Sequence, residues 1–110
     1  MELTKEQAID ISIELWTWLA ETGSGRKLEW QGWKKYGAMG CGCALCAYTE
    51  QQEEGAAAVT CKPCPYYRKF HGKCFKRNRI YAKWEKTNNI DQRKKYASQF
   101  LEQLRQLKEA

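Results

Sequence analysis

Residues 43–64 read CALCAYTEQQEEGAAAVTCKPC and contain two CxxC pairs, Cys43 with Cys46 and Cys61 with Cys64, separated by fourteen residues. Two residues between paired cysteines let both sulfurs turn toward one tetrahedral centre, and thiolates are ligands that Zn²⁺ favours. The spacing therefore predicts one Zn²⁺ ion bound by Cys43, Cys46, Cys61 and Cys64. A site closed by four thiolates has no open position for water or substrate, so we expect it to be structural.

Further donors near the two pairs leave the ligand set open. Cys41 precedes the first pair, while His71 and Cys74 follow the second. Cys74 in place of one of the four thiolates is the main alternative, and Cys41 and His71 are the other alternates. Three disulfides or an iron–sulfur cluster are less favoured, because no apolar signal segment opens the chain and the spacing departs from cluster motifs.

Helices are expected on both sides of this cysteine segment. Thr4 and Gln7 have capping-box spacing before a wide apolar face, and Gly23 provides a stop signal. Asn89 and Gln92 have the same capping-box spacing before a second amphipathic stretch, which reaches Glu109. The apolar face of this stretch is short for a dimerisation seam. We predict a mainly α, single small domain over 1–110: an N-terminal helix in 1–25, an irregular, zinc-organised knuckle in 26–86, and a C-terminal helix in 87–110.

Positive charge is concentrated in one part of the chain. Residues 62–86 contain nine Lys and Arg against one acidic residue, whereas residues 1–61 have a net charge of −4. Aromatic residues alternate with these cations, and together they are typical of surfaces that neutralise phosphates and stack on bases. The predicted contacts for nucleic acid or for an acidic protein surface are Lys62, Tyr67, Arg68, Lys69, Lys73, Lys76, Arg77, Arg79, Lys83 and Trp84.

Catalysis has little support in the sequence. A single histidine and the lack of clustered acids near the cysteines leave no obvious general base, and a four-thiolate zinc site cannot activate water. We therefore expect a non-enzymatic zinc module that binds nucleic acid. A protein-interaction module is the first alternative. A thiol redox or sensor protein is the second, because lysines beside Cys74 would stabilise a thiolate.

The chain resembles a group of small bacteriophage-encoded zinc-binding proteins of poorly defined function. The resemblance rests on Cys43-x-x-Cys46, Cys61-x-x-Cys64-Pro65, Gly72-x-Cys74 and the later pair Tyr81 and Trp84. It implies a metal-bound accessory protein made during phage infection and adds weight to Cys74 as a ligand, but it implies no activity. The protein-interaction alternative would be, for example, a phage factor that inhibits a host enzyme or defence system, such as an anti-CRISPR-type inhibitor. No run of residues is long and apolar enough to cross a bilayer, so we expect a cytoplasmic protein (in the host cell, if phage-encoded) with no membrane partner.

Overall fold

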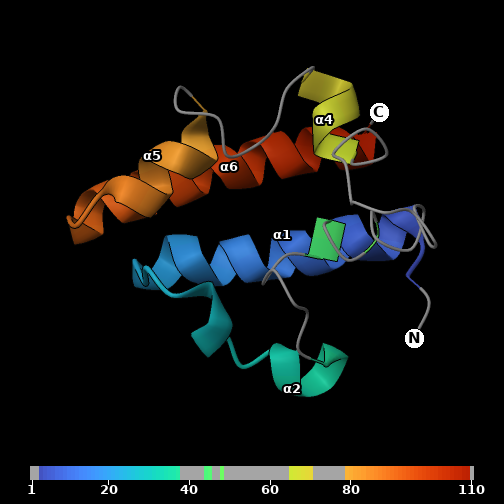
Figure 1. Cartoon of the computed structure of the whole chain (residues 1–110), viewed down its shortest axis with the longest axis horizontal. Helices are drawn as coiled ribbons and strands as arrows, with labels where there is room; N and C mark the ends of the chain where they lie inside the picture. The colour runs from blue at the N-terminus through green and yellow to red at the C-terminus, as the bar shows by residue number, and fades with distance from the viewer. Residues whose placement is uncertain (1–2, 38–43, 46–47, 49–64, 71–78, 110) are drawn as a thin grey trace, which may run out of the picture.

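The computed structural model of this chain describes residues 3–37, 44–45, 48, 65–70 and 79–109, with only the backbone for Leu28, Tyr67, Arg68 and Glu109. These residues are mostly helical and contain no strand, which confirms the mainly α class (Figure 1). The α-helices are α1 (Lys5–Thr22), α2 (Trp33–Tyr36), α4 (Pro65–Phe70), α5 (Ile80–Lys86) and α6 (Ile90–Glu109), with a short 3₁₀ helix, η1 (Lys27–Glu29).

Helix α1 begins and ends as its sequence predicts. The Gln7 backbone N–H donates to the Thr4 hydroxyl, and the Thr4 N–H donates to the Gln7 side-chain oxygen, both at 3.0 Å. This reciprocal capping box satisfies two N–H groups that have no partner inside the helix. At the other end Gly23 adopts a left-handed conformation (φ 71°), and its N–H donates to the Leu19 carbonyl at 2.9 Å.

Helix α6 runs antiparallel to α1 and packs along it (Figure 1). Contacts at both ends fix this pairing: Lys108 forms an ion pair with Asp10 (2.9 Å), and Arg93 Nε donates to the Gly23 carbonyl (2.8 Å). Asn89 caps α6, since its side chain accepts from the Gln92 N–H at 3.0 Å. The apolar stripe of α6 is buried in the core of this chain; its members are Ala97, Phe100, Leu101, Leu104 and Leu107.

Short helices occupy parts of the middle of the chain, where an irregular segment was predicted, so that prediction is wrong for these stretches. Helix α5 lies against α6 and contributes Trp84 to an aromatic cluster around Trp16 of α1. The rings of Trp16 and Trp84 meet edge to face with their centroids 4.8 Å apart, and the centroid of the Phe100 ring of α6 lies 4.5 Å from that of Trp16. Such aromatic pairs add about 0.5–1.5 kcal/mol beyond the area they bury. The third element of the core is therefore α5.

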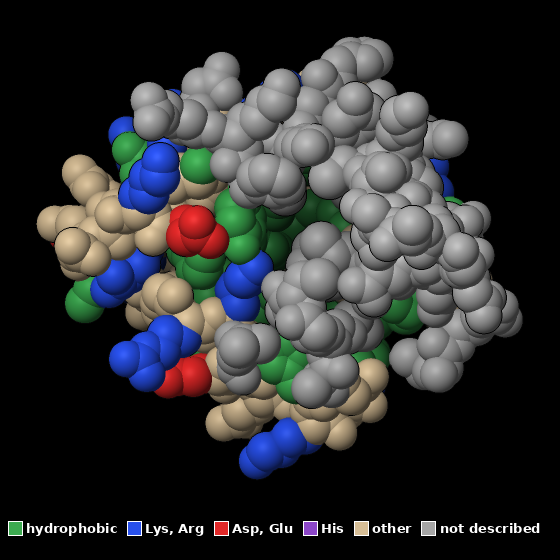
Figure 2. Space-filling view, in the orientation of Figure 1, with side chains coloured by type: hydrophobic (Ala, Val, Ile, Leu, Met, Phe, Trp, Pro, Cys, Tyr) green, Lys and Arg blue, Asp and Glu red, His purple; other side chains and the backbone are tan. Residues whose placement is uncertain are grey.

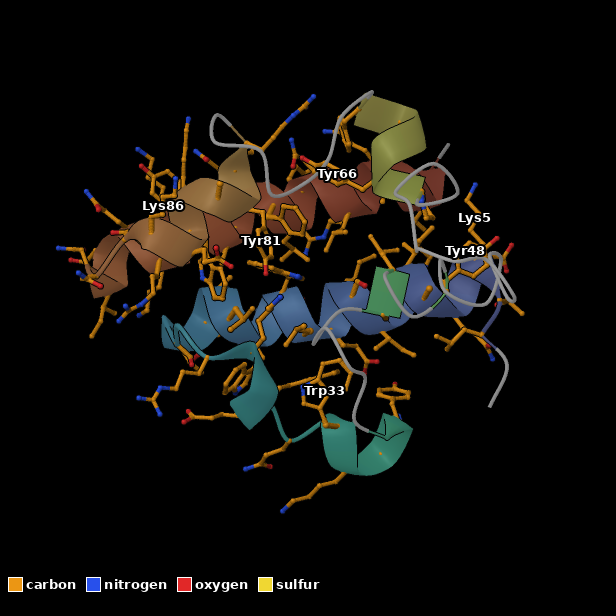
Figure 3. The ribbon with its side chains drawn as sticks, viewed as in Figure 1. Lys5, Trp33, Tyr48, Tyr66, Tyr81 and Lys86 are labelled. Atoms are coloured by element: carbon orange, nitrogen blue, oxygen red, sulfur yellow. The ribbon has the colours of Figure 1, made fainter. Side chains whose placement is uncertain are left out.

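Residues 27–36 form a smaller layer on the other side of α1 from α5 and α6 (Figures 1 and 3). Trp33 is buried, and its indole N–H donates to the Lys27 carbonyl at 2.9 Å. The Trp30 ring lies across Gly32 so closely that a Cβ there would come within 2.2 Å of it. The Tyr36 hydroxyl donates to Glu14 of α1. Trp30 and Trp33 therefore pack within this layer, with Trp33 buried and Trp30 half-buried against the core.

Candidate functional site

The predicted metal ligands lie outside the described residues. This applies to Cys43, Cys46, Cys61 and Cys64 and equally to the alternates Cys74, Cys41 and His71. Within the described part of the chain, no group of three His, Cys, Asp or Glu side chains is placed to hold a metal ion. The structure does describe residues directly adjacent to both CxxC pairs, and these show how the pairs join the rest of the fold.

The two residues inside the first CxxC pair are core residues. Ala44 is 1% exposed and Leu45 is 3% exposed, and both belong to the buried cluster formed by α1 and α6. Cys43 and Cys46 flank them directly in sequence. Each cysteine of this pair is therefore the direct sequence neighbour of a core residue, so a metal bound by the pair would be attached closely to the core.

The second CxxC pair continues directly into a core helix. Pro65 and Tyr66 follow Cys64 as the first two residues of α4, and both are buried. Tyr66 is 1% exposed, its ring stacks on Phe100 at 5.4 Å, and its hydroxyl donates to Gln103 Oε1 at 2.8 Å. Figure 3 shows Tyr66 beside α6. Leu45 and Tyr66 thus anchor the two predicted halves of the zinc site to the same hydrophobic core.

Only part of the predicted basic surface is described. Lys69 and Lys83 are exposed, while Arg79 is half-buried and donates from Nη2 to the Phe70 carbonyl at 3.0 Å. That bond satisfies a carbonyl in the last turn of α4, which gives Arg79 a structural role. Lys62, Lys73, Lys76 and Arg77 lie outside the described residues, and only the backbone is described for Tyr67 and Arg68.

Trp84 is placed differently from its prediction as a binding residue. Its side chain is 3% exposed and lies within the aromatic cluster of Trp16 and Tyr81. A ring in that position has no free face on which a base could stack. The indole N–H also has no hydrogen-bond partner in the described structure. Trp84 therefore belongs to the core, and this correction removes the only described aromatic residue from the predicted contacts.

Around the turn that follows α5, three exposed lysines were not among the predicted contacts. Lys86 ends α5, and Lys94 and Lys95 lie in the first turns of α6. The predicted basic segment stopped at residue 86, yet the three-residue turn 87–89 brings the start of α6 back alongside α5. Extending that segment across the turn would have included Lys94 and Lys95. The neighbouring Arg93 is not equivalent to them, because its guanidinium binds the Gly23 and Thr87 carbonyls.

A shallow groove of about 370 Å³ lies at the opposite end of the α1–α6 pair. Ile9 and Leu107 form its apolar wall, and the ion pair between Asp10 and Lys108 occupies its rim. Lys5 and Glu6 also line the groove, and all four of its charged residues are exposed.

Comparisons with known proteins give no further guide to the site. No protein-family model, no curated protein and no solved structure matches this chain. Within the described residues, no helix combines the length and the apolar character that crossing a membrane requires.

Proposed function

We propose that this chain is a non-enzymatic, structural-zinc protein that binds nucleic acid through basic side chains on its surface. The observation that carries the proposal is the way the described parts of residues 62–86 are folded. Their aromatic side chains Tyr66 and Trp84 are buried, while the ammonium groups of Lys69, Lys83 and Lys86 face solvent. A packed helical frame that presents cations is a common design for nucleic-acid binding.

The zinc part of the proposal rests on the chemistry of the four thiols and on the anchoring of their neighbours. Cys43, Cys46, Cys61 and Cys64 would hold the ion, and Cys74 is the alternate ligand. When bound, the ion would supply a fixed crosslink between the two CxxC segments and no catalysis, because a closed site activates no water. Leu45 and Tyr66 would transmit that constraint to the core.

Binding to DNA and RNA at increasing salt concentration tests the proposal. We expect the logarithm of the affinity to fall linearly with the logarithm of salt concentration, because each neutralised phosphate releases counterions. Lys69→Gln should weaken binding, and Lys34→Gln, which removes the same charge from an exposed position in α2, serves as a control. Undetectable binding to both nucleic acids at low ionic strength would contradict the proposal. A protein partner retained after nuclease treatment would then favour the acidic protein surface instead.

The metal content of the purified chain tests the zinc part separately. One equivalent of zinc per chain is expected, and single changes of Cys43, Cys46, Cys61, Cys64 and Cys74 to Ser should identify the four ligands by loss of metal. A chain that holds no metal, and whose cysteines react freely with thiol reagents, would favour the redox or sensor alternative.

A further inference from the structure

The exposed lysines on either side of the turn between α5 and α6 form no ion pair in the described structure. These are Lys83, Lys86, Lys94 and Lys95, and we refer to them as the turn lysines. By contrast, Lys108 pairs with Asp10, Arg105 with Glu102 and Arg26 with Glu29. Glu85 and Asp91 are the acidic residues of 83–95, so the four turn lysines outnumber them and the local potential is positive, which attracts a polyanion.

We infer that the turn lysines bind the phosphate backbone of double-stranded nucleic acid, without reading its bases. This inference rests on the proposed function and names the substrate class and the contacts of the same basic surface. It extends that surface beyond residue 86 into α6, where Lys94 and Lys95 lie.

The fold brings the turn lysines to one end of the molecule. Helix α5 ends at Lys86, the turn spans residues 87–89, and α6 starts at Ile90 and runs back along α5. Figure 3 shows Lys86 on the outer side of α5, away from α1, and Figure 2 shows Lys and Arg side chains gathered at this end. Trp84 on one side and Arg93 on the other hold the two helices in place beneath these lysines.

The burial of the aromatic rings near the turn lysines favours phosphate contacts over base contacts. Trp84 and Phe100 are buried, and the half-buried Tyr81 and Tyr96 pack against the core, with the Lys27 ammonium 4.6 Å from the Tyr81 ring centre. Binding to single strands usually needs rings on which bases can stack. Lysine is a point charge that contacts phosphate without geometric demands, and duplex DNA has about one charge per 1.7 Å of axis. The turn lysines are therefore better matched to a duplex.

The charge of α1 would orient the molecule on that duplex. Its exposed surface contains the acidic residues Glu6, Asp10, Glu14 and Glu21, with Lys5 as the only exposed cation of this helix. Figure 3 places Lys5 at the opposite end of the molecule from Lys86. Asp10 is paired with Lys108, and Glu21 lies at the turn end, two residues before Gly23. Glu6 and Glu14 would therefore repel phosphates from the part of α1 remote from the turn lysines, so the turn end should face the nucleic acid.

Two double substitutions and a matched control test this inference on the full, metal-loaded chain. The variants are Lys83→Gln with Lys86→Gln, and Lys94→Gln with Lys95→Gln; the control is Lys34→Gln with Lys35→Gln. Lys34 and Lys35 are also adjacent, exposed lysines, but they lie in α2 on the far side of α1. The Tyr36 hydroxyl, by hydrogen bonding, and then Glu14 raise the pKa of Lys35, so the control also removes a full charge.

Fluorescence anisotropy with a labelled duplex, and with one of its strands alone, provides the measurement. For each turn-lysine pair we expect duplex binding at low salt to be about tenfold weaker. The slope of log affinity against log salt concentration should become smaller by about 2, because each removed lysine no longer displaces the counterions of about one phosphate. The control should change the affinity by less than about twofold, and the duplex should bind more tightly than the single strand. Far-UV circular dichroism of every variant should be unchanged, because these side chains are exposed.

Failure of the inference can be distinguished from failure of the proposed function. If the unsubstituted chain binds nucleic acid but the turn-lysine pairs behave like the control, or if the single strand binds more tightly, the inference is overturned and the proposed function stands. If all three double variants weaken binding equally, net charge and not this surface drives binding, which also overturns it. If the unsubstituted chain binds neither form, both are overturned.

Discussion

At the scale of single residues, Gly23 meets two demands that no other amino acid can meet together. Its φ of 71° is in the left-handed region, and a Cβ there would lie 2.6 Å from Ile90 Cγ2. Gly23→Ala should therefore destabilise the protein through backbone strain, which costs about 1–2 kcal/mol, and through a steric clash at the start of α6. Urea denaturation should show a decrease in the free energy of unfolding that is larger than the backbone strain alone would cause.

Combining Gly23→Ala with Ile90→Ala separates the steric part of that loss from the strain. Removing the Ile90 side chain takes away the atom that the new Cβ would meet, so the double variant should lose less than the two single losses added together. Gly37 also has a positive φ, 84°, but its ψ of 142° places it in a region that is essentially glycine-only, and a Cβ there would meet nothing within 4 Å among the described residues. Gly37→Ala should therefore cost strain alone, about 1–3 kcal/mol, and Ile90→Ala should not reduce it. Strictly additive losses of Gly23→Ala and Ile90→Ala would show that the two residues are not in contact.

Arg93 and Lys94 are adjacent in sequence, yet only Arg93 has a structural role. Arg93 donates to the Gly23 carbonyl at 2.8 Å, and so connects the end of α1 to the start of α6. Arg93→Ala should reduce the free energy of unfolding by about 1.5–3 kcal/mol, since a hydrogen bond from a charged donor is removed and a carbonyl is left without its partner. Lys94→Ala, an exposed change, should stay within about 0.5 kcal/mol. Similar losses in thermal or urea denaturation would contradict this assignment.

At the scale of elements, the sequence predicted the two helices that have local start signals and missed α5. Helices α1 and α6 follow Thr4 and Asn89, whose side chains cap them. Helix α5 is only seven residues long, and Arg79 at its start provides no side-chain cap. Helices that short are unstable alone, so tertiary packing decides whether they form. The contact of Trp84 with Trp16, 68 residues away in sequence, is not visible in local sequence patterns.

The same reasoning explains which parts of the candidate site could be predicted. Charge is a property of composition, so the sequence is enough to place Lys69 and Lys83 in a basic segment, and both are exposed. Their role as contacts stays a prediction. The choice between a stacking ring and a core ring depends on burial, which is a property of the whole fold. That is why Trp84 was placed among the contacts from sequence and lies in the core in the structure. The cysteine spacing stays a prediction, because its thiols lie outside the described residues.

Substitution of Trp84 tests whether α5 is held by its aromatic contact. Trp84→Ala should cost about 3–5 kcal/mol, because it leaves a large cavity beside Trp16. Trp84→Phe should cost less, about 1–2 kcal/mol, since a ring remains and the indole N–H has no described partner to lose. Urea denaturation followed by circular dichroism measures both, with the exposed Lys83→Ala as control. If Trp84→Phe were as damaging as Trp84→Ala, an unrecognised hydrogen bond of the indole would be indicated.

At the scale of the whole molecule, we expect the α1–α6 pair to depend only partly on the predicted zinc site. The pair has its own caps, its own buried apolar faces and contacts at both ends, all formed by described residues. Leu45 and Tyr66, which are directly adjacent in sequence to predicted ligands, belong to the same core. The prediction therefore differs from the behaviour of small zinc fingers, whose whole fold depends on the metal.

Removal of zinc should therefore loosen the middle of the chain and leave the α1–α6 pair helical. With a strong chelator we expect most of the far-UV helical signal to remain, together with a lower melting temperature and a change in tyrosine environment as Tyr66 loses its fixed backbone. Tyr66→Phe, which removes only the hydrogen bond to Gln103, should lower stability by about 1 kcal/mol with zinc present. Its effect should shrink once zinc is removed, because α4 is then less firmly placed. Complete loss of the helical signal on chelation would show instead that the metal organises the entire fold, and an unchanged melting temperature would show that the anchors at Leu45 and Tyr66 do not connect a metal site to the core.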